Sequence, residues 1–382
     1  MLDWKRIRAD FPVTKKRVYF ISAGMSPIPT PVFERIMAGY RVLHDEGDIR
    51  FFKDLAENVA LREKIGRLIA ASSDDIVFIQ NTSMSMSIVA MSLKNVHGSG
   101  FNVVSMMDEF PATTVPLEYQ GIEMLYVEAL RDRYPIESVL DKVNDETVAV
   151  VTSYVQYSSG FRQDLNNLGA ELAKRGVMLI VNATQGFPLF PLDMKSMKIS
   201  ALSASCHKWG FAGHVGAVFY TAPAFRERYP SPLAGWLSVD TGDGDFIHTG
   251  KGVPFNLYRS AERYSFGTVN LQSINALSTS LDYLAKIGHT TIRARLFELG
   301  DLLIEKLNEL GVEMMTPVSN REERSSIISF RLGERTAGLF SYLMKNRIYV
   351  SYRNGNVRVA LNIFNNEEDI RQLIEAILSY LG

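Results

Sequence analysis

The sequence predicts an α/β protein. We expect a large domain on a mostly parallel seven-stranded sheet flanked by helices, and a smaller α+β domain at the C-terminus. Short apolar runs alternate with longer amphipathic stretches over residues 55–220, a pattern typical of βαβ units. The chain has 382 residues, of which 46% are hydrophobic and 22% charged, so it can bury the cores of two or three compact units. After residue 310, shorter strand and helix patterns alternate up to the C-terminus.

Seven short apolar runs are the candidate strands of the large sheet. They cover residues 75–80, 101–106, 123–128, 147–155, 177–183, 199–205 and 216–221. Helices are expected between several of them, where apolar residues recur every three or four positions. The clearest such segments are residues 56–70, 136–143 and 165–175, and Gly176 closes the last one as a C-cap glycine does.

The second half of the chain predicts the boundary of the large domain. Gly and Pro are frequent over residues 223–254, which indicates a long surface or interface segment. A helical pattern then covers residues 271–310. We therefore expect a large domain over residues 16–260. The small domain is expected to combine residues 1–15 with 280–382, joined to the large one by this long helix.

Charge and cysteine content exclude several classes of partner. Lys and Arg number 41 and Asp and Glu 42, so there is no basic excess to bind nucleic acid or an anionic membrane. The longest uncharged stretch of the first half, residues 76–93, is too polar to span a bilayer. One cysteine allows no internal disulfide, and the charged N-terminus lacks a signal-peptide core. We expect a cytoplasmic protein that acts on a small molecule.

The most specific local signal is SASCHKWGFAGHVGAVFY, residues 203–220. A predicted strand ends there at Ser205 and is followed by His207 and Lys208. The ordinary interpretation of a lysine is a solvated surface side chain, because lysine is rarely buried. The neighbours of Lys208 are aromatic, small and apolar, however, and desolvation lowers the pKa of a lysine. A neutral amine is nucleophilic toward an aldehyde, so the segment indicates Schiff-base chemistry at Lys208.

Two other segments place polar residues at the ends of predicted strands. Asn182 and Gln185 lie at and just beyond the carboxyl end of the fifth candidate strand, where open α/β sheets bind ligands. Asn81, Thr82 and Ser83 separate the first candidate strand from an apolar helix. The free N–H groups and the dipole of such a helix start favour an anion. Taken alone, these three residues favour an ordinary helix cap over an anion site.

Taken in order, these segments resemble the fold-type I pyridoxal-phosphate (PLP) enzymes. The resemblance is to the class V aminotransferase family, in the branch of cysteine desulfurases and isopenicillin N epimerase-like proteins. It runs over nearly the whole chain. The family's Ser-x-His-Lys motif is matched by residues 205–208, which implies that Lys208 carries the covalent link to PLP. EFPATTVP, residues 109–116, matches the segment that stacks an aromatic ring on the pyridine, which implies this role for Phe110.

The resemblance implies the remaining contacts as well. The residues implied to bind PLP are Asn81, Thr82, Ser83, Phe110, Asn182, Gln185, Ser205, His207, Lys208 and Thr268. SFGTVN, residues 265–270, resembles the segment that reaches the phosphate held by the other subunit, which implies a homodimer with Thr268 acting in the partner's site. Arg358 matches the arginine that binds a substrate α-carboxylate, for which a bidentate fork is suited. Arg353 is a second candidate, although a surface arginine is its ordinary interpretation.

The sequence departs from the family pattern at two places. The family has Asp where this chain has Asn182, and an amide offers the pyridine nitrogen a neutral hydrogen bond in place of a carboxylate. The desulfurases carry a nucleophilic cysteine on a loop before the carboxylate-binding arginine, but only four residues, NGNV, separate Arg353 from Arg358. The single cysteine, Cys206, is expected to be buried packing rather than a persulfide carrier.

Three functions remain open from the sequence. The first is a homodimeric PLP enzyme that acts on an amino acid or amine in the manner of the class V aminotransferases. The second is a PLP-dependent lyase or epimerase, in which Lys208 removes a proton and no amino group leaves. The third is a PLP-binding protein with little turnover, which Asn182 keeps open. No metal site is expected.

Overall fold

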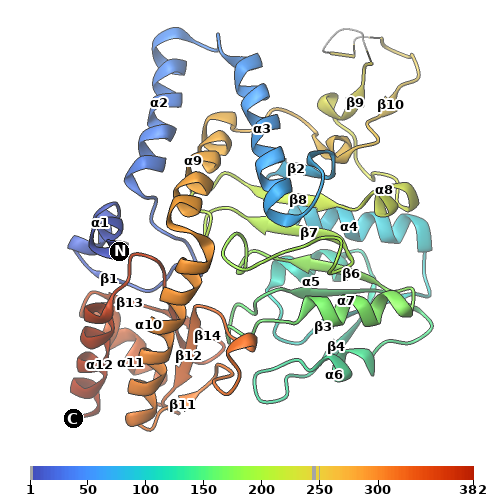
Figure 1. Ribbon diagram of the computed structural model, residues 1–382. Coiled ribbons are helices and arrows are strands. Elements are labelled where there is room, and N and C mark those ends of the chain that lie inside the picture. Colours follow the sequence, from blue (N-terminus) through green and yellow to red (C-terminus); the bar gives the residue numbers. More distant parts are fainter. Residues whose placement is uncertain (1–2, 243–246, 249) are drawn as a thin grey trace.

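A seven-stranded sheet occupies the right half of the view in Figure 1. The computed structural model describes residues 3–242, 247–248 and 250–382. The strands lie in the order β2-β8-β7-β6-β5-β3-β4, with β8 antiparallel to both its neighbours and the other adjacent pairs parallel. Their bounds are β2 Ile76–Ile79, β3 Asn102–Met106, β4 Glu123–Val127, β5 Thr147–Ser153, β6 Met178–Asn182, β7 Ile199–Ser205 and β8 Ala217–Thr221. All seven predicted strands form this sheet, so the fold class is confirmed.

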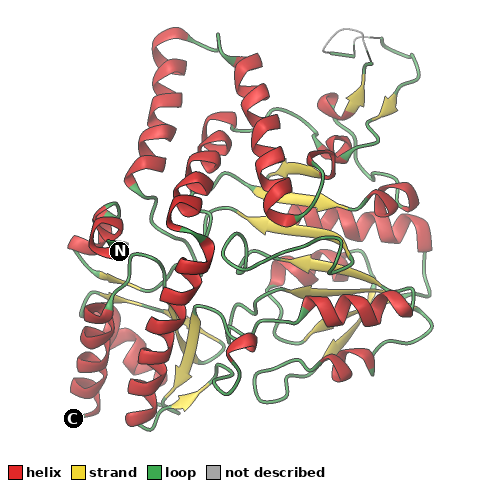
Figure 2. Cartoon of the chain, in the orientation of Figure 1, coloured by secondary structure: helices red, strands yellow, loops and turns green. Residues whose placement is uncertain are grey.

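Helices cover both faces of the sheet (Figure 2). The helices whose apolar side chains pack on one face are α4 Thr82–His97, α5 Pro111–Tyr119 and α8 Pro223–Arg228. Those on the other face are α3 Phe51–Ile69, α6 Ile136–Leu140, α7 Leu165–Lys174 and α9 Leu271–Ile287. Because the inner strands are buried on both sides, the sequence of a strand such as β6 is a continuous apolar run, Val177 to Val181, rather than an alternating one.

A smaller antiparallel sheet, in the order β11-β12-β15-β14, lies at the lower left of Figure 1. Its strands are β11 Glu313–Met314, β12 Ile327–Arg331, β14 Ser351–Arg353 and β15 Asn356–Ala360. The helices beside it are α10 His289–Glu309, α11 Thr336–Lys345 and α12 Glu367–Leu381. The remaining elements are α1 Trp4–Ala9, α2 Thr30–Glu46 and the short pairs β1 Val18–Tyr19 with β13 Ile348–Tyr349 and β9 Val239–Asp240 with β10 Asn256–Leu257.

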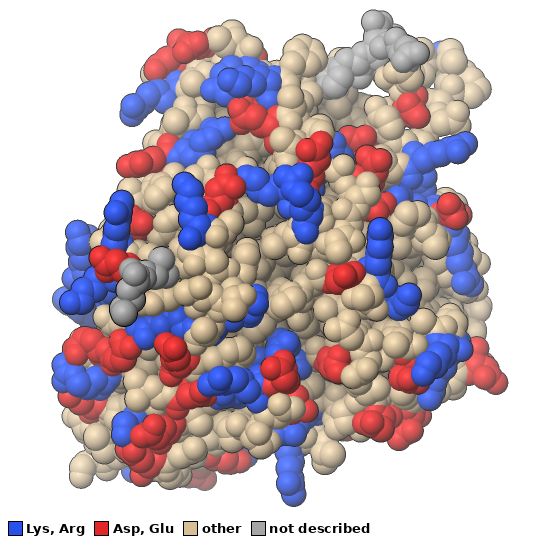
Figure 3. Space-filling model, viewed as in Figure 1, with Lys and Arg blue, Asp and Glu red and all other residues tan. Residues whose placement is uncertain are grey.

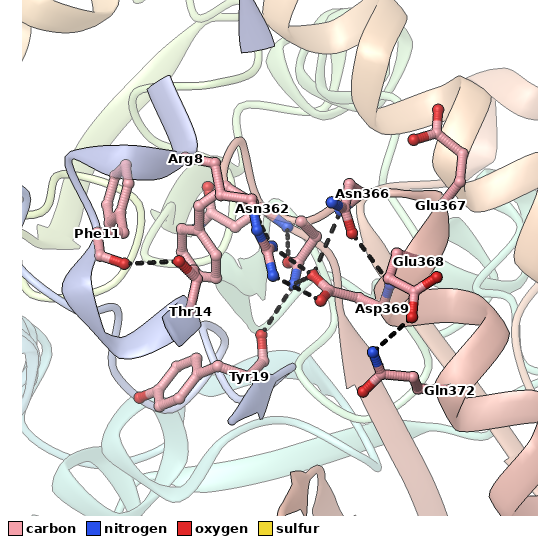
Figure 4. A network of polar contacts seen from close by, with 12 residues as sticks. Arg8, Phe11, Thr14, Tyr19, Asn362, Asn366, Glu367, Glu368, Asp369 and Gln372 are labelled. Carbon is pink, nitrogen blue, oxygen red and sulfur yellow. Dashed lines mark hydrogen bonds and ion pairs between the residues drawn. The ribbon is translucent and has the colours of Figure 1, made fainter. Parts of the chain in front are cut away.

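A polar network fixes the N-terminal helix α1 to the start of α12 (Figure 4). The guanidinium of Arg8 donates to both carboxylate oxygens of Asp369 at 2.7 and 2.8 Å. The Asp369 carboxylate also accepts the backbone N–H of Asn366, and the Asn366 side chain accepts the N–H of Asp369, which is a capping box. Asp369 is almost completely buried, so its negative charge depends on Arg8.

Two predicted segments differ from the structure. The helical pattern of residues 271–310 forms two helices rather than one, because Gly288 adopts φ +91°, ends α9 through an N–H bond to Leu284 and begins α10. The segment 223–254 holds α8 and part of the β9–β10 pair. The predicted surface character holds for only part of the segment. Leu233, Trp236 and Val253 are exposed, but Phe225, Tyr229 and Val239 are buried. Residues 243–246 and 249 lie outside the described ones.

The surface mixes both signs of charge. Figure 3 shows Lys and Arg interspersed with Asp and Glu over the face in view, as the net charge of -1 requires. Within the described ranges, no helix is both long and apolar enough to cross a membrane.

Candidate active site

A group of polar residues lies at the carboxyl ends of three adjacent parallel strands. Ser153, Asn182 and Ser205 are the last residues of β5, β6 and β7, and all three line one cavity of about 360 Å³. This is the edge at which open α/β sheets bind ligands, and the volume suits a small organic molecule. The cavity is closed on the opposite side by Arg353 and Arg358, which come from β14 and β15 of the small sheet.

The fold brings the residues predicted from the sequence into this cavity, with one exception. Those that line it are Asn81, Thr82, Ser83, Phe110, Asn182, Gln185, Ser205, His207, Lys208, Arg353 and Arg358. Thr268 does not line it. It lies exposed between two residues, Gly267 and Val269, of a separate cavity beside α3.

The start of α4 and a group of hydroxyls form the polar end of the cavity. Asn81 caps the helix by accepting the N–H of Met84 at 2.9 Å. The Oγ1 atom of Thr82 lies 2.9 Å from Ser205 Oγ and 3.3 Å from Thr184 Oγ1. Free N–H groups at the start of a 16-residue helix, together with these hydroxyls, can hold an anion.

Lys208 is buried beside this end without an anionic partner. Its side chain has no hydrogen bond or ion pair with any residue that the structure describes, and its Nζ lies 5.4 Å from the ring centroid of Phe110. Burial, with Arg358 and Arg353 nearby, lowers the pKa of Lys208 to about 7. A large part of this amine is therefore neutral, and so nucleophilic, near neutral pH.

Arg358 is the second buried cation. Its Nη1 donates to the carbonyl of Tyr157 at 2.6 Å and its Nη2 to Ser351 Oγ at 3.3 Å, while its buried Nε has no partner among the described residues. Burial, with Arg353 close by, lowers the pKa of Arg358 to about 10, so it stays charged at neutral pH. Among the described residues that line the cavity there is no Asp or Glu. Three cationic side chains with no carboxylate among them favour an anionic ligand.

Two amide side chains are fixed at the ends of β6. The Oδ1 of Asn182 accepts the N–H of Thr184 at 3.1 Å, and its Nδ2 donates to Thr113 Oγ1 at 2.9 Å. A backbone N–H can only donate, so the oxygen of Asn182 is assigned by this bond. Gln185 is held similarly, donating to the carbonyl of Ala23 and accepting the indole N–H of Trp209.

His207 lies next to Lys208 and its ring stacks on His214, with centroids 4.9 Å apart. Burial, helped by the positive charge of Lys208 and by His214, lowers the pKa of His207 to about 4. The imidazole is therefore neutral at physiological pH. It can donate one hydrogen bond to an anion without adding a positive charge.

Residues 20–26 connect the small sheet to this side of the cavity. The amide of Phe20 donates to Tyr349 and its carbonyl accepts from Ala360, next to β15. At the other end, the amide of Ser26 donates to the carbonyl of His207, and Asn362 donates to Ser26 Oγ. Between these two anchors, the segment contributes two residues to the cavity wall, Ala23 and Gly24.

Several lining residues were not predicted from the sequence. Ser153 ends β5 and Tyr157 follows it, and their position at a strand end was the signal that could have identified them. Glu109 does not line the cavity but lies directly beneath it. Its buried carboxyl accepts from the Ser153 amide at 2.5 Å and from Gln156 Nε2 at 2.7 Å, and burial raises its pKa although these bonds oppose the shift.

The family model for aminotransferase class V matches residues 18–373. The chain belongs to the class V aminotransferase family. It is similar to a probable cysteine desulfurase of Pyrococcus abyssi (strain GE5 / Orsay), with 24% identity over 96% of this chain and 95% of the relative. It is also similar to the uncharacterized aminotransferase YcbU of Bacillus subtilis (strain 168), with 24% identity over 98% of this chain and 97% of that protein.

Among solved structures, the apo cysteine desulfurase of Thermococcus onnurineus NA1 has the same fold, with a TM-score of 0.89 and 21% identity, covering 100% of this chain and 98% of that one. The fold is thus that of the fold-type I PLP enzymes, as predicted. Membership of the class V aminotransferase family confirms the prediction of a PLP-dependent enzyme and of pyridoxal phosphate as its cofactor.

The residues of the cavity fit this cofactor. The start of α4 and the hydroxyls of Thr82 and Ser205 could hold its dianionic phosphate. Its aldehyde matches Lys208, a buried amine with no partner of its own in the described part of the chain. Phe110, of which 39% is exposed, offers a ring face to the cavity beside this amine.

Proposed function

We propose that this chain is a PLP-dependent enzyme of the class V aminotransferase type that acts on an amino acid or amine, with Lys208 as its covalent and proton-transferring residue. The observation that carries the proposal is a buried, unpaired lysine in a cavity whose other charged groups are both arginines. When bound, PLP stabilises negative charge on the carbon that bears the substrate's amino group.

The position of each residue in the cavity determines the role that we assign to it. Thr82, Ser83, Ser205 and neutral His207 would hold the phosphate, and Phe110 would stack on the pyridine ring. Arg358 would bind the substrate's carboxylate, with its unpartnered Nε as a free donor. Lys208, with a pKa of about 7, can then take a proton from the substrate carbon at neutral pH and return it.

Borohydride reduction of the purified holoprotein tests the role of Lys208. Peptide mapping is expected to find the pyridoxyl group on Lys208 and on no other lysine, and Lys208→Ala is expected to abolish the label. A label on another lysine would overturn the assignment. The unreduced holoprotein, offered a panel of amino acids and amines, is expected to form a carbonyl product from the amino donor.

Asn182 favours a second candidate function, a PLP-dependent lyase or epimerase. Its Oδ1 is occupied by the N–H of Thr184, so the group left for a ligand is its amide nitrogen, which can only donate. A neutral donor suits an unprotonated pyridine nitrogen. Such a nitrogen accepts less negative charge than a pyridinium does, and we expect this to slow transamination more than elimination or epimerisation. Loss of chirality or of a β-substituent, without keto-acid formation, would select this function. Retention of PLP with no product from any donor would leave a PLP-binding protein.

The relatives named as cysteine desulfurases raise sulfur transfer as a question. We propose that this chain does not carry a persulfide. Cys206 is fully buried, does not line the cavity, and has its pKa raised to about 12 by burial. The turn between Arg353 and Arg358 is a tight hairpin in which Asn354 and Gly355 have φ of +49° and +79°, which leaves no room for a mobile loop.

We also propose that the enzyme is a cytoplasmic homodimer in which Thr268 reaches the phosphate held by the partner subunit. Exposed large apolar side chains on α2, α3 and the segment that follows β9 support an interface. They are Phe33, Met37, Phe52, Val59, Val253 and Phe255. Light scattering after size exclusion is expected to give about twice the chain mass of 42.9 kDa. Phe33→Glu is expected to yield monomers, and Thr268→Ala to weaken PLP binding in an intact dimer.

A further inference from the structure

A second cavity of about 180 Å³ adjoins the active-site cavity. Three segments of the chain contribute to both, namely residues 108–110, 157–158 and 353–358. The rings of Phe110 and Tyr157 both line the first cavity, with their centroids 5.2 Å apart. Tyr157 also donates from its hydroxyl to Asn354 Oδ1, which belongs to the second cavity.

The two cavities have opposite charge. Counting the residues that the structure describes, the first is lined by Lys208, Arg353 and Arg358 and by no carboxylate. On the same basis, the second is lined by Asp108 and Asp132 and by no Lys, Arg or His. A ligand that extends through both would therefore be recognised by an anionic group at one end and a cationic group at the other.

The second cavity also holds polar groups that have no partner in the described part of the chain. Asn356 is 6% exposed and its buried Oδ1 accepts no hydrogen bond. Ser158 is also 6% exposed and its hydroxyl makes no hydrogen bond to a described residue. Unpaired buried polar atoms are costly, so a donor placed among them would be stabilised.

The carboxylates are free to bind a cation. Asp132 makes no hydrogen bond or ion pair with a described residue, while Asp108 accepts one bond, from the Tyr134 hydroxyl at 3.0 Å. Arg331, the cation that lowers the pKa of Asp132, is engaged by Glu313. Burial raises the pKa of Asp132 to about 6, opposed by Arg331 and reinforced by Asp108 and Glu313.

We propose that the second cavity binds the distal ammonium or guanidinium group of the substrate, so that the substrate class is the basic α-amino acids. This inference rests on the proposed function, since the α-amino and carboxylate groups would occupy the first cavity. The second cavity is several times the roughly 30 Å³ of one water molecule, which gives room for the cationic group and its adjoining methylene. The rings of Phe110 and Tyr157 would contact the rest of the side chain.

The test is a titration of the holoprotein with matched pairs of amino acids, followed by the absorbance of the cofactor. L-ornithine and L-lysine are expected to bind about tenfold more tightly than their neutral counterparts L-norvaline and L-norleucine, the worth of one charge-assisted contact. Asp132→Asn is expected to reduce this preference to less than about twofold. Asn tolerates the left-handed backbone at this position, φ +61°, so the fold is preserved. Glu137→Gln, at an exposed acidic residue of α6, is the control and is expected to keep the preference.

Equal affinity for charged and neutral members of each pair, or a preference that survives in Asp132→Asn, overturns the inference. A second arm separates this failure from failure of the proposed function. In protein whose PLP has been reduced onto Lys208, 1,4-diaminobutane is expected to bind in calorimetry and to lose most of its affinity in Asp132→Asn. If no amino acid perturbs the cofactor, the proposed function fails, and the diamine alone decides whether the cavity binds an organic cation. Displacement of the diamine by millimolar potassium or magnesium would assign the cavity to an inorganic cation and overturn the inference.

Discussion

Lys208 is the residue whose surroundings determine most of the chemistry. It is 8% exposed, and the charges near it are those of Arg358 and Arg353, so burial and like charge both disfavour its protonated form. The amine is kept neutral by its environment rather than by a general base. The same penalty is a cost to the fold, because the ionised lysine of the unfolded chain must lose its proton or its solvation on folding.

The rate at which apoprotein takes up PLP should follow the titration of Lys208, because the neutral amine attacks the aldehyde. The rate is expected to rise as the pH increases through about 7 and to level off above it. Arg358→Gln removes one of the charges that lower this pKa, so the midpoint is expected to move upward. Stopped-flow absorbance at several pH values measures both. A midpoint near the ordinary lysine value in the wild type would contradict the burial argument.

The stability of the apoprotein gives an independent check. The folded pKa of Lys208, about 7, lies below its ordinary value of 10.5, so the unfolded state binds more protons between these values. Stability contributed by this site is therefore expected to increase as the pH rises from 7 to 10. The gain is roughly 3 to 5 kcal/mol, at about 1.4 kcal/mol per unit of pKa. Urea unfolding of wild type and Lys208→Met at several pH values gives the slope of the unfolding free energy against pH for each protein. Identical slopes would contradict the expectation.

Cys206 should be chemically silent in the native protein. It is fully buried and burial raises its pKa to about 12, so iodoacetamide is expected to label it only after unfolding. Cys206→Ser is expected to retain activity with a stability loss of about 1 to 3 kcal/mol from the buried hydroxyl. Sulfur release from L-cysteine that disappears in Cys206→Ser would show the thiol to be catalytic.

The sequence identified site residues where a motif marked them, and missed those supplied by tertiary structure. Lys208 and His207 belong to one short motif, so their proximity is local. Asp108 and Asp132, in contrast, come from segments around β3 and β4 and meet Asn356 of β15 only through folding. No spacing in the chain links these three residues. Assignment of the individual roles in the active-site cavity stays a prediction.

At the scale of elements, substitution by alanine is expected to have opposite effects on stability at two glycines that lie inside helices. A Cβ on Gly169 of α7 would lie 2.0 Å from the carbonyl oxygen of Met197, whereas one on Gly300 of α10 would meet nothing closer than Leu361 at 4.0 Å. Alanine favours a helix over glycine by up to about 1 kcal/mol. Gly300→Ala is therefore expected to stabilise by about 0.5 to 1 kcal/mol. Gly169→Ala is expected to destabilise by about 1 to 3 kcal/mol, because the clash outweighs propensity.

Chemical denaturation of the two glycine variants and the wild type measures whether each substitution raises or lowers the free energy of unfolding. Each variant is the control for the other, since both replace a buried helical glycine with alanine. Stabilisation by Gly169→Ala would mean that the Met197 loop can move aside at little cost, and destabilisation by Gly300→Ala would mean that the space beside Leu361 is smaller than described.

The elements of the large sheet were predictable because most of its strands are short, largely apolar runs that are buried on both faces, whereas the edge strand β4 is only partly buried. The break between α9 and α10 was not, since the apolar spacing continues across Gly288 and only its backbone conformation reveals the end of a helix. The pair β1–β13 was also missed, because strands of two residues carry no periodicity. The proposed division into a large and a small domain stays a prediction.

At the scale of the whole molecule, the ion pair of Arg8 and Asp369 joins the helices α1 and α12, which lie near the two ends of the chain. Arg8→Ala would leave the buried Asp369 carboxylate without its cation, and is expected to lower the free energy of unfolding by about 3 kcal/mol. Arg6→Ala, an exposed arginine of the same helix, is the control and is expected to change it by less than about 0.5 kcal/mol. Urea titration decides between them. A small effect of Arg8→Ala would mean that water replaces the guanidinium at the start of α12.

The segment 20–26 has a mechanical consequence for ligand binding. It is bonded at one end to Ala360, at the end of the strand that carries Arg358, and at the other to the carbonyl of His207. A substrate carboxylate that moves Arg358 toward the cavity would therefore also pull on residues 20–26. Ala23 and Gly24, in the middle of this segment, line the cofactor cavity. Because such coupling is reciprocal, amino acids should strengthen the binding of PLP by the same factor by which PLP strengthens their own binding. Amide hydrogen exchange of Phe20 and Ser26 would record both events on one stretch of chain.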